Sequence, residues 1–254
     1  MGRRILRSAK KSSNLIRNPE LRSQRREEVA AVALGLFMQD GFHNTGVRQI
    51  AHRAGISPGS VLTYFRDKEE ILFYIVDKEQ GVMEEAVANC VARLRPTLET
   101  GADAREALEE VLDTYLRVVD QIARYTLLAY QETKSLRPAW REGLLARERR
   151  IQNLFVEVLR YGVQQGIYSP EHLAVKAHSI MMLAQAWAVR RWALKEIGSI
   201  EEYSAIMKPL ILGMLSTGVD QTGKRDGLQV QETRQQMDWG EMPPRKPHAS
   251  TGSA

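Results

Sequence analysis

The chain has 254 residues, 43% of them hydrophobic, and a formal net charge of +5. That length is enough to bury a substantial core in one or two domains, whereas the single cysteine, Cys90, excludes an internal disulfide framework and a thiolate zinc cluster. No apolar run approaches the ~18 residues that span a membrane, so we expect a cytoplasmic protein with no membrane partner.

The charge is unevenly divided along the chain. Residues 1–68 contain 13 Lys and Arg against 5 Asp and Glu, a net charge of +8, whereas the remaining residues have a net charge of −3. A basic first quarter on a slightly acidic body predicts that only this end approaches a polyanion. A solvated basic tail is the alternative that charge alone leaves open.

The first twenty residues show no helical periodicity and carry six basic side chains before the first acidic residue, Glu20. We expect a disordered basic arm over residues 1–20. From Arg22 onward the apolar residues recur with a period of 3.6, which predicts a helix ending near Asp40-Gly41.

Two short apolar stretches then follow on either side of Gly55, which can adopt the left-handed conformation of a turn. Ser57 is a good N-cap, and Pro58 suits the first position of the second short helix. Asp67 precedes a longer helix whose first turn is acidic, as the helix dipole favours. Two short helices joined by a glycine turn are typical of the DNA-reading helix-turn-helix unit, which we assign to residues 21–68.

The rest of the chain also has helical periodicity. We expect a long helix from about Ile71 to Pro96, where the proline should end it. Further helices are predicted over about 108–122, 125–134, 144–159, from Ser169 to Ile197-Gly198, and from Ser199 to Thr217-Gly218 with a kink at Pro209. No stretch alternates with a period of two, so we predict an all-α fold with no sheet. Residues 219–254 are polar and are expected to form a disordered tail.

The segment GFHNTGVRQIAHRAGISPGSVLTYFRDKEEIL, which begins at Gly41, resembles the DNA-binding domain of TetR-type transcriptional regulators. The positions that match the family pattern are Gly41, Phe42, Thr45, Val47, Ile50, Ala51, Ala54, Gly55, Ser57, Gly59, Tyr64, Phe65 and Lys68. The downstream helices agree with the family only in number and length. Two positions depart from the pattern: Gly46 lacks the usual hydroxyl cap, and Leu62 replaces a common aromatic residue.

The resemblance implies an N-terminal three-helix helix-turn-helix domain followed by a helical ligand-binding and dimerisation domain over residues 69–218. It also implies a homodimer that binds a palindromic double-stranded DNA operator as a transcriptional regulator. We interpret the chain as a repressor that a small-molecule effector releases from DNA.

The resemblance also indicates which side chains meet DNA. Tyr64 and Lys68 are expected to contact phosphates, Ser60 and Thr63 to read bases, and Arg48 to reach a phosphate or a base unless it is merely solvated. The full set of expected DNA-binding residues is Thr45, Arg48, Ser57, Pro58, Gly59, Ser60, Thr63, Tyr64 and Lys68. Arg22, Arg25 and Arg26 could contact the flanking backbone or be solvated.

In the helical body, large apolar side chains with scattered polar groups suggest a pocket for an elongated or aromatic apolar effector. The expected lining is Tyr115, Leu128, Tyr130, Glu132, Phe155, His178 and Trp187. The expected dimer interface is Trp187, Arg190, Arg191, Leu210 and Met214. A fatty acyl thioester is one candidate effector, because Arg190 and Arg191 could meet its phosphates. Ordinary core packing is the alternative for Trp187.

No catalytic constellation is present in the sequence, and neither G-x-S-x-G nor H-E-x-x-H occurs. His172 and His178 are six residues apart, which is not the i, i+4 spacing of two metal ligands on one helix face. We therefore expect no enzyme activity, metal or cofactor. Two other classes stay open: a ligand-independent DNA-organising or protein-interaction factor, and an enzyme in the C-terminal domain.

Overall fold

The computed structural model describes residues 19–216. Three helices form the N-terminal part: α2 (Pro19–Asp40), α3 (Val47–Arg53) and α4 (Pro58–Tyr64). The first of them begins at Pro19, so the last two residues of the expected basic arm belong to a helix. The remainder of that arm and the expected tail lie outside the described residues.

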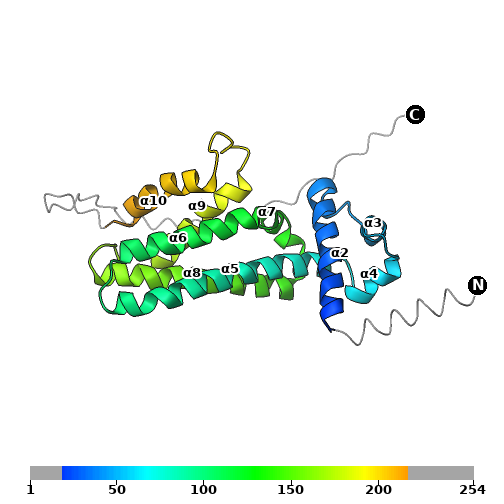
Figure 1. Cartoon of the computed structure of the whole chain (residues 1–254), viewed down its shortest axis with the longest axis horizontal. Helices are drawn as coiled ribbons and strands as arrows, with labels where there is room; N and C mark the ends of the chain where they lie inside the picture. Colours follow the sequence, from blue (N-terminus) through cyan, green and yellow to red (C-terminus); the bar gives the residue numbers. More distant parts are fainter. Residues whose placement is uncertain (1–18, 217–254) are drawn as a thin grey trace, which may run out of the picture. The chain divides into compact units, whose positions relative to one another are not determined.

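The body consists of six α-helices within the described residues (Figure 1). They are α5 (Lys68–Glu99), α6 (Ala104–Gln121), α7 (Ala123–Glu132), α8 (Pro138–Gln164), α9 (Leu173–Val189) and α10 (Ile200–Leu215), with a 3₁₀ turn, η1 (Thr133–Ser135), after α7. Residues 19–216 contain no strand, and only an isolated bridge joins Tyr168 to Ser216. The prediction of an all-α fold is confirmed.

The apolar side chains form two cores. The smaller core joins α2, α3 and α4 to the first turns of α5 and takes Leu128, Leu136 and Leu144 from the body. The larger core lies among the body helices α5, α6, α8, α9 and α10. Helix α5 contributes to both cores, since Ile71 and Ile75 are buried in the smaller one and Val87 and Val91 in the larger one.

Helix α5 does not end at Pro96, as the sequence led us to expect, but continues to Glu99. A proline removes one backbone donor and crowds the carbonyl one turn earlier. Here it lies in the last turn, where few further bonds depend on it. Burial of Leu98 in the larger core anchors that turn, and the Thr97 hydroxyl donates to the Leu94 carbonyl over 2.8 Å.

The start of α9 is also displaced, because it begins at Leu173 and not at Ser169. Ser169 does not cap this helix: its backbone N–H donates to the Leu215 carbonyl over 3.2 Å. The Lys176 ammonium donates to both the Ser169 carbonyl and its hydroxyl, each over 2.8 Å. The chain instead enters α9 through His172, in the left-handed region with φ 55°.

Helix α9 ends at Val189, about eight residues before the expected end. The following residues form turns, and Ser199 then caps α10 by accepting a hydrogen bond from the Glu202 backbone N–H. These turns let α10 fold back along α9, where the rings of Tyr203 and Trp187 stack with centroids 5.2 Å apart. The helix α10 runs through Pro209 and ends at Leu215.

One close approach in the body requires glycine. A Cβ at Gly162 in α8 would lie 2.1 Å from the Tyr168 ring, which folds back over the end of the helix and is almost fully buried. Gly143, in the same helix, has open space where its Cβ would lie.

We predict that Gly162→Ala lowers the free energy of unfolding by about 1–3 kcal/mol, because the buried ring has to shift. The matched change Gly143→Ala should raise it by up to about 1 kcal/mol, because alanine favours the helix. Urea denaturation measures both. Equal effects of the two substitutions would contradict the tight contact at Gly162.

Candidate nucleic-acid interface and ligand cavity

Helices α3 and α4 are joined by a four-residue turn that the local sequence specifies. Gly55 has φ 67°, in the left-handed region that glycine adopts without a steric penalty. The Ser57 hydroxyl accepts a hydrogen bond from the Ser60 backbone N–H over 3.0 Å and so caps α4, with Pro58 in the first turn. The turn and cap expected from the sequence are both present.

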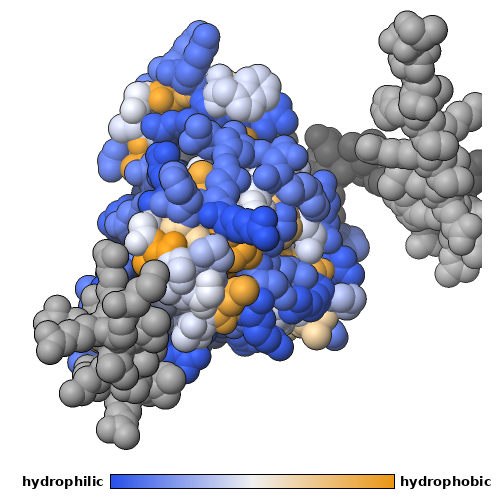
Figure 2. All heavy atoms as spheres, turned by 90° about the vertical axis from the view of Figure 1, so that its right-hand side faces the viewer, coloured by the Kyte–Doolittle hydropathy of each residue, from blue (hydrophilic) through white to orange (hydrophobic). Residues whose placement is uncertain are grey.

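The outer side of α4 is exposed. Pro58, Gly59, Leu62 and Thr63 all face solvent, and Leu62 is 51% exposed. The Thr63 hydroxyl donates to the Gly59 carbonyl over 2.9 Å. Figure 2 views the molecule from the side of α2, α3 and α4, and this face is largely hydrophilic with scattered hydrophobic patches. An exposed helix with small residues at its start can approach a nucleic-acid groove closely.

Arg48 and Arg53 of α3 are both exposed, and none of the hydrogen bonds or ion pairs found within residues 19–216 involves either of them. By contrast, Arg26 is held inside the N-terminal part. Its guanidinium lies over the rings of Phe65 and Tyr74, at 4.4 and 4.7 Å, and donates to the Tyr64 carbonyl. Of the basic residues that the sequence left undecided, Arg26 is therefore structural.

Two residues expected to contact DNA, Thr45 and Lys68, instead bond to backbone carbonyls of the loop between α2 and α3. Thr45 is 1% exposed, and its hydroxyl donates to the Gly41 carbonyl over 2.9 Å. The Lys68 ammonium donates to the carbonyls of Phe42, His43 and Thr45, over 2.8, 3.1 and 3.0 Å. An ammonium has three donors, so this clamp occupies all of them and fixes the loop between α2 and α3.

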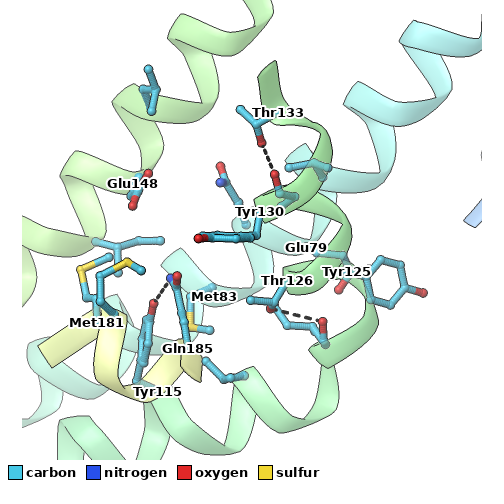
Figure 3. Close-up of a pocket in the computed structure, with 18 residues that line it drawn as sticks. Glu79, Met83, Tyr115, Tyr125, Thr126, Tyr130, Thr133, Glu148, Met181 and Gln185 are labelled. Atoms are coloured by element: carbon cyan, nitrogen blue, oxygen red, sulfur yellow. Dashed lines mark hydrogen bonds between the residues drawn. The ribbon is translucent and has the colours of Figure 1, made fainter. Parts of the chain in front are cut away.

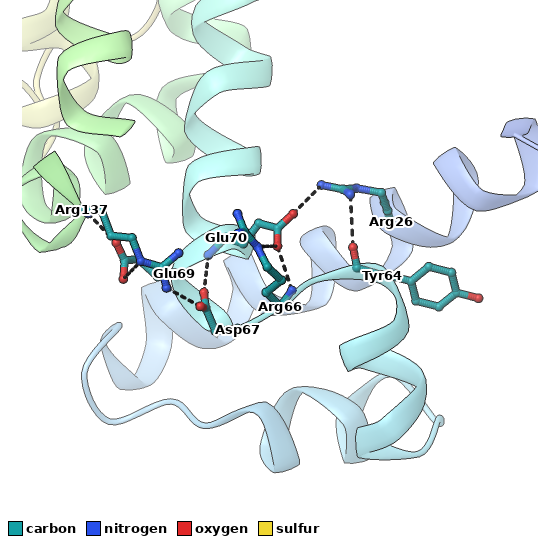
Figure 4. A network of polar contacts seen from close by, with 7 residues as sticks. All are labelled: Arg26, Tyr64, Arg66, Asp67, Glu69, Glu70 and Arg137. Carbon is teal, nitrogen blue, oxygen red and sulfur yellow. Dashed lines mark hydrogen bonds and ion pairs between the residues drawn. The ribbon is translucent and has the colours of Figure 1, made fainter. Parts of the chain in front are cut away.

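Tyr64 also differs from expectation, because the sequence placed it on the outward side of α4. Its side chain is 8% exposed and packs in the smaller core, although Figure 4 shows its ring pointing away from the neighbouring polar network. The inward turn follows from helix geometry, since Tyr64 is three residues after the buried Val61 and shares its face.

A network of carboxylates and guanidinium groups surrounds the start of α5 (Figure 4). Glu70 pairs with Arg26 at 3.5 Å and with Arg66 at 3.3 Å, while Asp67 and Glu69 pair with Arg137 from the loop before α8. Burial opposes ionisation of Asp67, but the hydrogen bonds from Arg137 and the backbone outweigh it and lower its pKa. The network thus joins the helix-turn-helix part to the body.

The body contains a cavity of about 330 Å³ between α5, α6, α7, α8 and α9 (Figure 3). Val76 and Met83 line it from α5, Tyr115 from α6, Tyr130 from α7, and Ile151 from α8. The other lining residues are Glu79, Gln80, Val119, Ile122, Tyr125, Thr126, Ala129, Thr133, Leu145, Glu148, Met181, Met182 and Gln185. The cavity is mostly apolar with a few polar groups, which is the usual composition of a site for a small molecule.

The polar groups of the cavity come from different helices. The Gln185 amide of α9 donates to the Tyr115 hydroxyl of α6 over 2.7 Å, and burial raises the pKa of that tyrosine. Glu79 of α5 and Glu148 of α8 line the same space, and burial raises the pKa of Glu79. The Gln80 side-chain oxygen is buried without a hydrogen-bond partner.

Only two of the seven expected ligand-binding residues, Tyr115 and Tyr130, line the cavity. The other five lie elsewhere: Leu128 is in the smaller core, Phe155 and Trp187 are in the larger core, Glu132 faces His43 and Ser135, and His178 is exposed. The sequence reasoning followed large apolar side chains, and these mostly fill cores. Polar residues interrupting the apolar faces of α5 and α8, at Glu79 and Glu148, were the available signal for the cavity.

The expected interface residues also divide between the core of the chain and its surface. Trp187 is 1% exposed, and its indole N–H donates to Asp120 over 2.6 Å, so it belongs to the core of its own chain. Arg191 lies over the Trp187 ring at 3.6 Å, and Arg190 lies over Trp192, both in the turns after α9. Leu210 and Met214 are exposed on α10, where a partner could cover them.

Two family models match the chain. Residues 30–75 match the model of bacterial regulatory proteins of the tetR family, and residues 101–192 match the model of the tetracyclin repressor-like C-terminal domain. The first spans α3, α4 and the clamped loop, and the second spans most of the cavity wall. Within residues 19–216, none of the helices is both long and apolar enough to cross a membrane.

Several known proteins are similar over most of the chain. The transcriptional regulator HbdR of Aromatoleum sp. (strain CIB) is 29% identical over 77% of this chain and 82% of its own length. The transcriptional repressor KstR2 of Rhodococcus jostii (strain RHA1) is 27% identical over 67% of this chain and 80% of its own. The solved structure of AibR with isovaleryl coenzyme A and operator DNA has a TM-score of 0.61 and 20% identity, covering 76% of this chain and 98% of its own. That last similarity indicates a shared fold.

We predict that Lys68→Met lowers the free energy of unfolding by about 2 kcal/mol, because hydrogen bonds from a charged donor are lost at three carbonyls. The control Arg48→Met should stay within about 0.5 kcal/mol of the unchanged chain, as is usual for an exposed side chain. Denaturant unfolding monitored by circular dichroism measures both. A stability of Lys68→Met equal to that of the control would show that the clamp is not formed.

Proposed function

The chain belongs to the TetR family of bacterial regulatory proteins, and from this premise we propose that it is a cytoplasmic transcriptional repressor. As a homodimer it binds a palindromic operator, and a small, largely apolar molecule releases it. The observation that supports this most directly is the position of the cavity on α5. Val76 both lines the cavity and packs in the smaller core that holds α2, α3 and α4 together.

In this proposal α4 lies in the major groove as the reading helix. Ser60 and Thr63 read bases, and the exposed Leu62 adds an apolar contact of the kind that favours a thymine methyl group. Ser57, Pro58 and Gly59 form the helix start that approaches the DNA. Arg48 of α3 contacts a phosphate, which adds affinity without sequence preference.

Lys68, Thr45 and Tyr64 have supporting roles in this arrangement. The Lys68 clamp and the Thr45 hydroxyl hold the loop before α3, and Tyr64 holds α4 on the smaller core. The Lys68 backbone N–H, at the start of α5, could still meet a phosphate, because helix starts favour anions.

The dimer forms through the exposed side of α9 and α10. Large apolar side chains in an uncovered surface patch indicate an interaction site. Those exposed here are Val175 and Met182 on α9 and Ile206, Leu210 and Met214 on α10. A two-fold dimer through this face presents two copies of α4, which explains a palindromic operator.

The effector releases the protein from DNA because it binds two conformations of the dimer with different affinities. An effector that binds more tightly to one spacing of the two reading helices shifts the population toward it. The cavity wall on α5 continues directly into the part of that helix packed against α2, α3 and α4. A change in the cavity therefore reaches the DNA-binding part through one continuous helix.

The effector is largely apolar, since the cavity wall is dominated by aliphatic, aromatic and thioether side chains. A fatty acyl thioester is one candidate, and the similar AibR structure contains isovaleryl coenzyme A. Arg190 and Arg191 do not line the cavity, so any phosphate contact from them would lie outside it. The alternative is a ligand-independent DNA-organising protein. Its affinity for DNA would stay unchanged even when a small molecule binds to it.

We predict that Arg48→Ala weakens binding by a similar factor on all operator variants and lowers the slope of log affinity against log salt by about 1, because one phosphate contact is lost. Protection mapping of the DNA beside the gene first defines the operator. Thr63→Ala should instead change the preference among base substitutions. An unchanged salt slope for Arg48→Ala would remove Arg48 from the phosphate contacts.

We predict that Leu210→Glu converts the dimer to a monomer at micromolar concentration, because it places a charge in an apolar interface. Leu210 is 60% exposed in the single chain, so folding should be unaffected. Sedimentation velocity measures the association state. The control Val82→Glu changes an exposed apolar residue on α5 outside this face, and loss of the dimer there would contradict the assignment.

A further inference from the structure

The charged residues that line the cavity between α5, α6, α7, α8 and α9 are all acidic. None of its eighteen lining residues is Lys, Arg or His, whereas two of them, Glu79 and Glu148, are acidic. An anionic ligand in this space would face two carboxylates with no opposing cation. The cavity therefore disfavours anions on charge alone.

None of the cations nearest to these carboxylates in sequence lines the cavity. Lys78, beside Glu79, bonds to Glu27 over 2.9 Å. Arg147, which precedes Glu148 on α8, binds Glu84 and Asp77 of α5, and Arg150 also binds Glu84. Arg149, which follows Glu148, is exposed and does not line the cavity. No hydrogen bond or ion pair of the Glu79 or Glu148 carboxylates is found within residues 19–216, so both are available to a ligand.

The neutral groups of the lining also offer acceptors. The hydroxyl hydrogens of Thr126 and Thr133 are used on carbonyls four residues earlier, those of Ile122 and Ala129, at 3.3 and 2.6 Å. Their oxygens keep only lone pairs for a ligand. The buried oxygen of Gln80 has no partner within residues 19–216, although a buried acceptor without a hydrogen bond is unfavourable. A donor on the ligand would satisfy it.

The apolar part of the lining favours a flat ring. Tyr115 and Tyr130 line the space, and so do Met83, Met181 and Met182. Figure 3 shows Met83 and Met181 near the Tyr115 ring. Methionine adapts to irregular shapes and makes favourable contacts between its sulfur and aromatic rings. An aromatic ligand would therefore find both stacking partners and a deformable wall.

We propose that the cavity binds an aromatic molecule whose buried end carries hydrogen-bond donors, a hydroxyl or an amino group, and no carboxylate or phosphate. Glu79, Glu148 and the Gln80 oxygen accept these hydrogen bonds. This inference rests on the proposed function, since it takes the cavity as the effector site, and it narrows the class of effector. In an acyl thioester, only an uncharged, donor-bearing acyl group would enter, and its phosphates would stay outside.

Three probes with one ring system and different polar groups test the proposal. They are 2-naphthol, a neutral donor; 2-(aminomethyl)naphthalene, a cationic donor; and 2-naphthoate, an anion. Titration calorimetry on the full chain without DNA measures each dissociation constant. We expect at least one donor probe to bind about tenfold or more tightly than 2-naphthoate, a difference of about 1.4 kcal/mol. Comparison of the two donor probes shows whether the cavity prefers a hydroxyl or an amino group.

Paired variants connect the selectivity to the two carboxylates. Glu79→Gln with Glu148→Gln removes both charges at nearly constant volume, and should reduce the preference for donors over 2-naphthoate by about tenfold. The matched control is Glu85→Gln with Glu142→Gln, on the same two helices but exposed and outside the cavity. The control should keep the preference of the unchanged chain.

Three results would overturn the proposal: binding of 2-naphthoate as tight as that of both donor probes, an unchanged preference in the double glutamine variant, or no binding of any probe. Operator protection is measured separately on the same protein. An operator-binding chain that prefers the anion contradicts only this inference. A chain with the expected preference but no protected DNA contradicts the proposed function instead.

Discussion

Burial of one helix in two hydrophobic cores is the constraint on which the rest of this structure depends. Helix α5 has 32 residues, and its first turns pack against α2, α3 and α4 while its later turns pack in the body. Close-packed interiors transmit displacement because they contain little free volume. Since Val76, Glu79 and Met83 of the same helix line the cavity, the two parts of the molecule are mechanically connected there.

Charge at the start of α5 adds a second connection. Asp67 and Glu69 bind Arg137 of the body, and Glu70 binds Arg26 of α2. Because the pKa of Asp67 is lowered in the folded chain, its contribution to stability is present above the ordinary carboxyl value of 3.8 and is lost as the pH falls through the lowered pKa. The partly exposed pairs contribute modestly. They orient the junction, whereas the apolar contacts of α5 hold it together.

The helix-turn-helix segment shows how one motif combines residues of two kinds. The side chains of Thr45 and Lys68 donate hydrogen bonds to backbone carbonyls, and Tyr64 packs in the smaller core. These three residues therefore stabilise the segment itself. Arg48 and Leu62 are exposed on it. The match to a family pattern does not distinguish the two kinds, because both are required at fixed spacing. Burial and hydrogen-bond partners do.

The sequence by itself determined the all-α class, because helical periodicity is repeated along the chain. It also determined the left-handed turn at Gly55 and the cap at Ser57, because both depend on residues within one helical turn. The tertiary structure decided the rest. Ser169 did not start α9, because its backbone bonds to Leu215, which is remote in the chain. Trp187 entered the core through contacts with distant helices. The cavity likewise unites Glu79 and Glu148 from helices far apart in the sequence, and no local pattern encodes that meeting.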